Sequence, residues 1–147
     1  MNALLGDRLT VTLHHLSTLM QQFGDRFLRE RFGVSHAQFV FIATLATIAP
    51  PPDITTLAEC LGITKAAVSK RVPGLVEAGL VTTSTDAANA RRVLLEPTPA
   101  ALQLIERAGP ALDAAFSGLL AGVDGVELGS LHRDLALLVA HLERTGA

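Results

Sequence analysis

Apolar residues recur at helical spacing along most of the chain. In residues 3–31 they advance by alternate steps of four and three positions, through Leu9, Leu13, Leu16, Met20, Phe23 and Phe27. This heptad spacing predicts one long helix with a narrow apolar seam, which needs a partner helix from the same chain or from a second copy. Gly33 is expected to end this helix, and Ser35 to cap the next one.

The second predicted helix has an apolar side and an abrupt end. Its buried residues are expected to be Phe39, Ile42, Leu45 and Ala46. Three consecutive prolines, at positions 50–52, stop this helix and form a stiff connector.

Residues 55–81 have the pattern of two short helices joined by a tight turn. Thr56 and Glu59 have the spacing of a capping box, which predicts that Thr56 begins the first helix. Gly62 stands at the reversal, and Thr64 is placed to cap the second helix. The apolar side of this second helix is expected to consist of Val68, Val72, Leu75 and Val76.

The other side of that second helix is small and cationic, as in the recognition helix of a helix-turn-helix motif. Cations neutralise phosphates, while hydroxyl groups reach phosphate oxygens or base edges. We therefore predict a DNA-binding face. Thr64, Lys65, Ala66 and Ser69 are expected to lie near base edges, and Lys70 and Arg71 to hold phosphates.

A β-hairpin is predicted directly after this motif. Residues 80–84 and 92–96 are rich in Val, Leu and Thr and are separated by the polar residues 85–91. A hairpin in this position is a wing. Arg91 and Arg92 are predicted to reach phosphates or a minor groove, and Asn89 is predicted as a further DNA contact in the same loop.

Two more helices with apolar seams follow the wing. Thr98 and Pro99 open the first of them, Gly109-Pro110 is expected to kink it, and residues 122–125 form a turn. The last seam consists of Leu128, Leu131, Leu135, Leu138 and Leu142. These apolar seams are more than one small winged domain needs to cover its own core, which favours a homodimer. Dimers of helix-turn-helix proteins place two recognition helices about 34 Å apart.

The predicted fold class is therefore mainly α (α+β), a single domain over residues 1–147. Residues 35–97 are expected to form the winged helix-turn-helix region. Residues 1–34 and 98–147 are expected to form a helical dimerisation region.

Composition supports a folded chain with one basic module. Of the 147 residues, 49% are apolar, and the net charge is −2. Residues 64–92 contain five Lys or Arg and two Asp or Glu, a net charge of +3, so the rest of the chain carries −5. A basic module on an acidic body is typical of a protein that meets DNA on one face.

The sequence also predicts a cytoplasmic protein. No apolar run approaches the roughly 20 residues that span a bilayer, and no secretory signal peptide is expected. The single cysteine, Cys60, excludes an intrachain disulfide and fits a reducing compartment. Cys60 is expected to be a small core residue rather than a redox sensor.

The order of these parts resembles the MarR family of bacterial transcription regulators over nearly the full chain. The carrying motifs are Gly33-Val34-Ser35 with Gln38-Phe39, Leu57-Ala58 through Leu61-Gly62-Ile63, Val68-Ser69, residues 75–81, and Asp86 with Arg91. The resemblance implies a homodimer that binds a palindromic operator and represses nearby genes. It also implies release by a small aromatic or phenolic ligand, bound where the dimerisation helices meet the winged region.

Two departures from the family pattern concern DNA binding. Asn89 stands where the family usually has a second acidic residue, and Pro73-Gly74 stands where it has polar or charged residues. Pro73 removes a helical hydrogen bond, which predicts weaker or differently angled DNA binding. The alternative function is a dimeric winged-helix protein-interaction module that has lost operator binding.

Other candidate chemistry is sparse. Phe39 and Phe41 are candidates to contact an aromatic effector, with His14 or Arg26 holding its polar group, although phenylalanines more often fill a core. The five histidines lack the spacing of metal ligands, so neither a metal site nor a cofactor is expected. No catalytic constellation is present, which indicates that the protein is not an enzyme.

Overall fold

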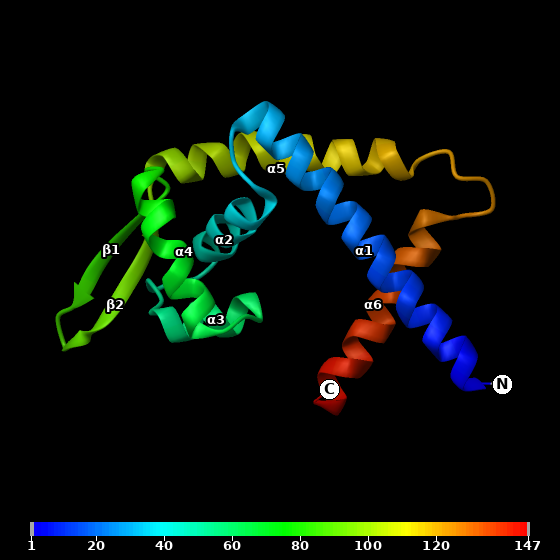
Figure 1. Cartoon of the computed structure of the whole chain (residues 1–147), viewed down its shortest axis with the longest axis horizontal. Helices are drawn as coiled ribbons and strands as arrows, with labels where there is room; N and C mark the ends of the chain where they lie inside the picture. The colour runs from blue at the N-terminus through cyan, green and yellow to red at the C-terminus, as the bar shows by residue number, and fades with distance from the viewer. Residues whose placement is uncertain (1, 147) are drawn as a thin grey trace. The chain divides into compact units, whose positions relative to one another are not determined.

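The computed structural model describes residues 2–146, with side chains from Arg8 onward. It is mostly helical with one small antiparallel sheet, which confirms the predicted fold class (Figure 1). The described elements are α1 (Asn2–Phe32), α2 (His36–Ala46), α3 (Ile54–Leu61), α4 (Lys65–Glu77), β1 (Val81–Asp86), β2 (Asn89–Pro97), α5 (Pro99–Leu120) and α6 (Leu128–Thr145). They fall into two compact units that divide between Phe116 and Ser117.

The boundary between α1 and α2 is as predicted. Gly33 has a φ of 71° and donates its amide to the carbonyl of Arg29, which ends α1. Ser35 caps α2 in a capping box. Its hydroxyl accepts from the Gln38 amide at 3.0 Å, and the Gln38 side chain accepts from the Ser35 amide at 2.9 Å.

The predicted start of α3 was wrong. Asp53, not Thr56, is the N-cap, and its carboxylate accepts from the Thr56 amide at 2.8 Å. Asp53 follows the proline run in extended backbone and is a strong cap, so the helix begins at Ile54. The turn after α3 is as predicted, because Gly62 adopts the left-handed conformation with a φ of 65°.

The wing has longer strands than its composition suggests. We predicted a loop over residues 85–91, but β1 and β2 extend into it and leave a turn at residues 87–88. Asp86 favours this turn because its carboxylate accepts from the Ala88 amide at 3.0 Å. Regular pairing ends at Thr85 with Val93, and Asp86 pairs next with Asn89, so residues 90–92 form a bulge.

Backbone contacts fasten the base of the wing to the connector before α3. The Leu95 amide donates to the Pro52 carbonyl at 2.9 Å, and Asp53 forms an isolated antiparallel bridge with Leu94. The wing is therefore attached directly to the start of the helix-turn-helix motif.

The core of the first unit lies beneath α2, α3, α4 and the wing. Its fully buried side chains include Phe41, Ile42, Leu57, Val68, Val81 and Leu95, with Leu28 from α1 and Ala101 and Ala108 from α5. Two predicted core residues were wrong. Ala46 is exposed because α2 turns Phe41 inward instead, and Val76 is 43% exposed because it lies on the same side of α4 as Ser69.

The seams of the long helices are only partly covered. The Phe23 ring lies 5.4 Å from that of Phe116 inside the first unit, whereas Leu9 of α1 is 55% exposed. Thr98 opens α5, and α5 continues as one helix past Gly109-Pro110. In the second unit, none of the described residues of α6 is buried.

Candidate nucleic-acid interface

The α4 helix presents the small, cationic face that the sequence predicts. Thr64 caps it by accepting from the Ala67 amide at 3.1 Å. Val68 and Leu75 fix its inner side because both are buried in the core. The predicted base-reading and phosphate-holding residues are all exposed: Thr64, Lys65, Ala66, Ser69, Lys70 and Arg71.

These side chains do not all point the same way. A helix turns by about 100° per residue, so Lys65 and Ser69 lie within about 40° of each other. Arg71 lies about 160° around the helix from Ser69. It faces a cavity beside α1 and α2 and is therefore separated from the residues expected near bases.

Pro73 lies on the exposed side of α4, and the helix continues through it from Lys65 to Glu77. Because proline has no amide hydrogen, the Ser69 carbonyl lacks its usual helical donor. The helix resumes its pattern after this point, since the Ala78 amide donates to the Gly74 carbonyl at 3.0 Å.

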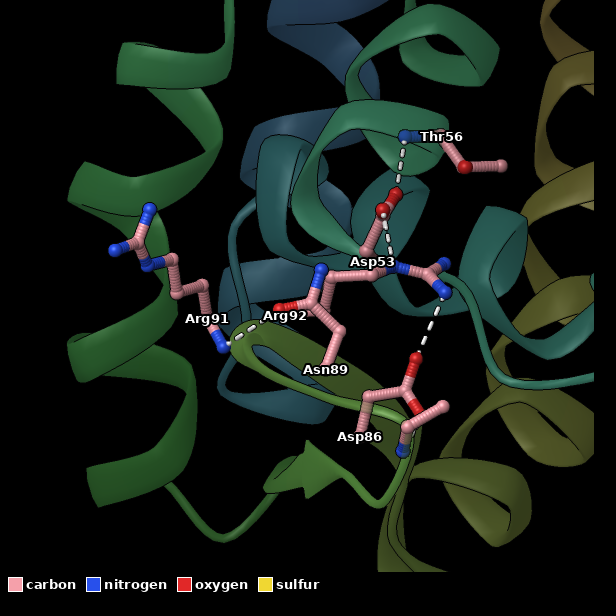
Figure 2. A network of polar contacts seen from close by, with 7 residues as sticks. Asp53, Thr56, Asp86, Asn89, Arg91 and Arg92 are labelled. Atoms are coloured by element: carbon pink, nitrogen blue, oxygen red, sulfur yellow. Dashed lines mark hydrogen bonds and ion pairs between the residues drawn. The ribbon is translucent and has the colours of Figure 1, made fainter.

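The two wing arginines differ sharply. Arg92 is bound to two carboxylates: its Nε donates to Asp53 at 3.0 Å and its Nη1 donates to Asp86 at 2.8 Å (Figure 2). Arg91 is exposed, and in Figure 2 its side chain points away from both carboxylates. Asn89 accepts from the backbone amide of Arg91 at 3.1 Å, so its side chain orders the wing tip.

The hydrogen bonds of this cluster favour the ionised forms of Asp53 and Arg92. Hydrogen bonds from Thr56, and then from Arg92, lower the pKa of Asp53 to about 2. Asp53, and then Asp86, raise the pKa of Arg92. The sequence analysis missed both Asp53 and the pairing of Arg92, although an Asp between a proline run and an apolar helix is a recognisable cap signal.

Comparison with solved structures shows the same fold in other proteins. BldR from Sulfolobus solfataricus has 22% sequence identity and a TM-score of 0.75, with 91% of this chain and 94% of that one covered. MepR from Staphylococcus aureus, in complex with DNA, has 21% identity and a TM-score of 0.75, with 90% and 97% covered. A putative MarR-like transcription regulator from Bacillus cereus has 19% identity and a TM-score of 0.80, with 95% and 99% covered.

The MarR family model matches residues 29–92, which span the end of α1, α2, the helix-turn-helix motif and much of the wing. This matched segment of the chain is similar to the MarR family. A comparison with curated protein sequences gives no significant match.

A cavity of about 320 Å³ lies beside α4. It is lined by Arg29, Ser35, Ala37, Gln38, Phe41, Lys70, Arg71, Gly74 and Leu75. Three of these residues are cationic. The sequence analysis missed Arg29 and Gly74, because only the folded chain brings the end of α1 beside α4.

The predicted effector residues do not come together. Phe41 lines the cavity beside α4, whereas Arg26 lines a second, more open cavity of about 410 Å³ with Asp25 and His36. Phe39 is buried in the core, and His14 is exposed on α1 and lines neither cavity.

Neither Cys60 nor the described His, Asp and Glu residues form a further site. Cys60 is exposed, so its assignment to the core was wrong: Leu57 and Ala58 set the buried side of α3, and Cys60 falls to one side of it. Among the side chains that the structure describes, from Arg8 onward, no group of three or more His, Cys, Asp or Glu could hold a metal ion. No helix within residues 2–146 is long and apolar enough to cross a membrane.

Proposed function

We propose that this protein is a homodimeric regulator of transcription that binds double-stranded DNA at a palindromic operator. The observation that carries the proposal is the outer face of α4, where Lys65, Ala66, Ser69 and Lys70 are all exposed beside a wing with an exposed Arg91. The same fold in the DNA complex of MepR supports it. In this proposal, residues 35–97 bind DNA, and residues 1–34 and 98–147 form the dimer.

The residues of this interface divide by chemistry. Thr64, Lys65, Ala66 and Ser69 lie near base edges in the major groove, where small side chains allow a close approach of the helix. Lys70 and Arg91 neutralise phosphates or, for Arg91, enter the minor groove. Regulation of transcription, rather than catalysis, is the role of the protein, and we propose that it acts in the cytoplasm.

Dimerisation accounts for the exposed apolar seams. Leu9 and Leu16 on α1 are 55% and 39% exposed, and Leu138 and Leu142 on α6 are 48% and 52% exposed. Exposed leucines at heptad spacing mark a surface that another helix covers. A second copy supplies such helices with matching seams and brings a second recognition helix to the other half of a palindrome.

The cavity beside α4 is the best candidate for an effector site. Its lining combines the aromatic ring of Phe41 with the cations Arg29, Lys70 and Arg71, which suits a small aromatic carboxylate or phenolate. Lys70 is also the residue of α4 that is proposed to neutralise a phosphate. A ligand that holds Lys70 in the cavity would take it from that phosphate, which provides a route to release of a repressor from DNA.

A second candidate function is a dimeric protein-interaction module that has lost operator binding. Pro73 inside the recognition helix is the observation that favours it. The two functions differ in one measurable property, because an interaction module has no salt-dependent affinity for DNA.

The test is fluorescence anisotropy with duplex DNA from upstream of the protein's own gene, at two salt concentrations. We expect sequence-preferring binding that weakens as salt rises. Lys70→Ala should weaken binding to all sequences and reduce the salt slope by about 0.9 for each phosphate that Lys70 neutralises. Arg133→Ala on α6 is the matched control and should change neither. A folded dimer that shows no binding at low salt would favour the interaction module.

A further inference from the structure

Arg92 holds together two parts of the chain that are far apart in sequence. Asp53 is the N-cap of α3, and Asp86 lies at the tip of the wing. The carboxylates of both accept from one guanidinium, at 3.0 and 2.8 Å. Figure 2 shows Arg92 lying between the two acidic side chains, while Arg91 leaves the wing in another direction.

This ion-pair cluster lies beyond the backbone contacts that fasten the base of the wing. The backbone bonds between residues 52–53 and 94–95 fasten only the base of the hairpin. Beyond Thr85 and Val93 the regular ladder stops, and Arg92 belongs to the bulge that follows. The side chain of Arg92 therefore continues the attachment of the wing past the point where the regular strand pairing ends.

The charge balance argues against a direct role of Arg92 on DNA. One guanidinium between two carboxylates gives a net charge of −1, which does not attract phosphate. The side chains of Asp53 and Asp86 are only 20% and 18% exposed. Withdrawing Arg92 to bind a phosphate would leave two poorly solvated carboxylates without their shared cation.

We propose that Arg92 is a positioning residue, which with Asp53 and Asp86 fixes the wing against the start of α3 and so sets where Arg91 meets DNA. This inference rests on the proposed DNA-binding function. It reassigns Arg92, which the sequence analysis placed among the residues that bind phosphate. It leaves Arg91 as the cation at the wing bulge that binds the nucleic acid.

The salt dependence of DNA binding separates positioning from phosphate binding. Arg92→Ala should weaken operator binding about 10-fold and leave the slope of log K against log salt unchanged, because Arg92 neutralises no phosphate. Arg91→Ala should weaken binding and also lower the slope, by about 0.9 for each phosphate that Arg91 neutralises. A reduced slope in Arg92→Ala would overturn the proposal.

Asp53→Asn gives an independent test. Asparagine keeps a side-chain oxygen that can cap α3, so the helix start is preserved while the charge beside Arg92 is removed. If Arg92 positions the wing, Asp53→Asn should weaken DNA binding. The Asp53→Asn/Arg92→Ala double variant should bind DNA no more weakly than Arg92→Ala alone, and Arg92→Lys should bind more tightly than Arg92→Ala. If Arg92 bound a phosphate and Asp53 restrained it, Asp53→Asn would tighten binding and overturn the proposal.

A measurement without DNA keeps this inference separate from the proposed function. Amide hydrogen exchange at Ala88 and Arg91 should rise in Arg92→Ala and Asp53→Asn and stay unchanged in the control Arg133→Ala. If the wild-type protein does not bind DNA but these exchange rates rise, the proposed function fails and the wing attachment stands. Unchanged exchange in Arg92→Ala would refute the attachment itself.

Discussion

The leucines of the winged region and those of α6 contrast in their surroundings. Leu57 of α3 and Leu95 of β2 are fully buried, whereas Leu137 and Leu142 of α6 are 64% and 52% exposed. The residue type is the same, so the difference lies in what surrounds it. Helices α2, α3 and α4 and the wing cover one another, and α6 has a regular seam without a buried residue among those described.

The contrast separates two sources of stability. The winged region has a core of its own, which the free energy of burying apolar side chains holds together within one chain. In the proposed homodimer, the seam of α6 gains the same kind of free energy when a partner helix covers it. The following substitutions test whether the winged region folds on its own core and whether the α6 seam serves the proposed dimer.

The largest effect is expected on the free energy of unfolding, from a substitution at a buried leucine of the winged region. Leu57→Ala leaves a cavity in the core of the winged region and should lower the free energy of unfolding by about 4 kcal/mol. Urea denaturation followed by circular dichroism measures this loss. Leu137→Ala, at an exposed position, is the control and should change stability by less than about 0.5 kcal/mol. Equal losses of stability in Leu57→Ala and Leu137→Ala would contradict the difference in burial between the winged region and α6.

The next effect should appear in assembly rather than in folding. Leu142→Ala should raise the dissociation constant of the proposed dimer about 100-fold, because about 3 kcal/mol of apolar burial is lost across two symmetric protomers. Sedimentation at several concentrations measures it. Leu137→Ala changes the same residue type on the same helix, outside the seam, and should leave the dimer intact. Dimerisation that withstands Leu142→Ala would contradict our assignment of the seam.

A smaller effect is expected on the recognition helix. Replacing Pro73 and Gly74 with alanine restores a helical donor and removes a flexible position, which should stabilise the protein by about 1–3 kcal/mol. A Cβ at Gly74 would have no neighbour within 4 Å, so the site has room for it. We also expect tighter operator binding, measured by anisotropy. Unchanged or looser binding would show that Pro73 does not limit the interface.

The smallest effect is expected on the stability of the fold at acidic pH. The folded pKa of Asp53, about 2, lies below its ordinary value of 3.8, so ionised Asp53 stabilises the fold above about pH 4. That contribution should disappear as pH falls from 3.8 towards 2. Thermal unfolding across this acidic range measures the change. Asp53→Asn should flatten the pH dependence of stability in this window.

The helix-turn-helix motif was predictable because its signals act over a few residues. Thr64 bonds to an amide three positions away, and Gly33 and Gly62 end helices by their own conformations. The error at the start of α3 also concerned a signal that acts over a few residues. Asp53 and Thr56 can both cap a helix, and the structure uses Asp53. Ala46 and Val76 were assigned to the core because apolar character alone does not say which side of a helix is covered.

The sequence by itself determined the order of the elements, the caps of α2 and α4 and the outward face of the recognition helix. Those features follow from backbone conformation and from periodicity along one segment. Only the tertiary structure decided that Arg92 is bound to Asp53, 39 positions away, and that Arg29 and Gly74 share a cavity. Such pairs depend on how separate segments pack in space, and no local pattern in either segment encodes its distant partner.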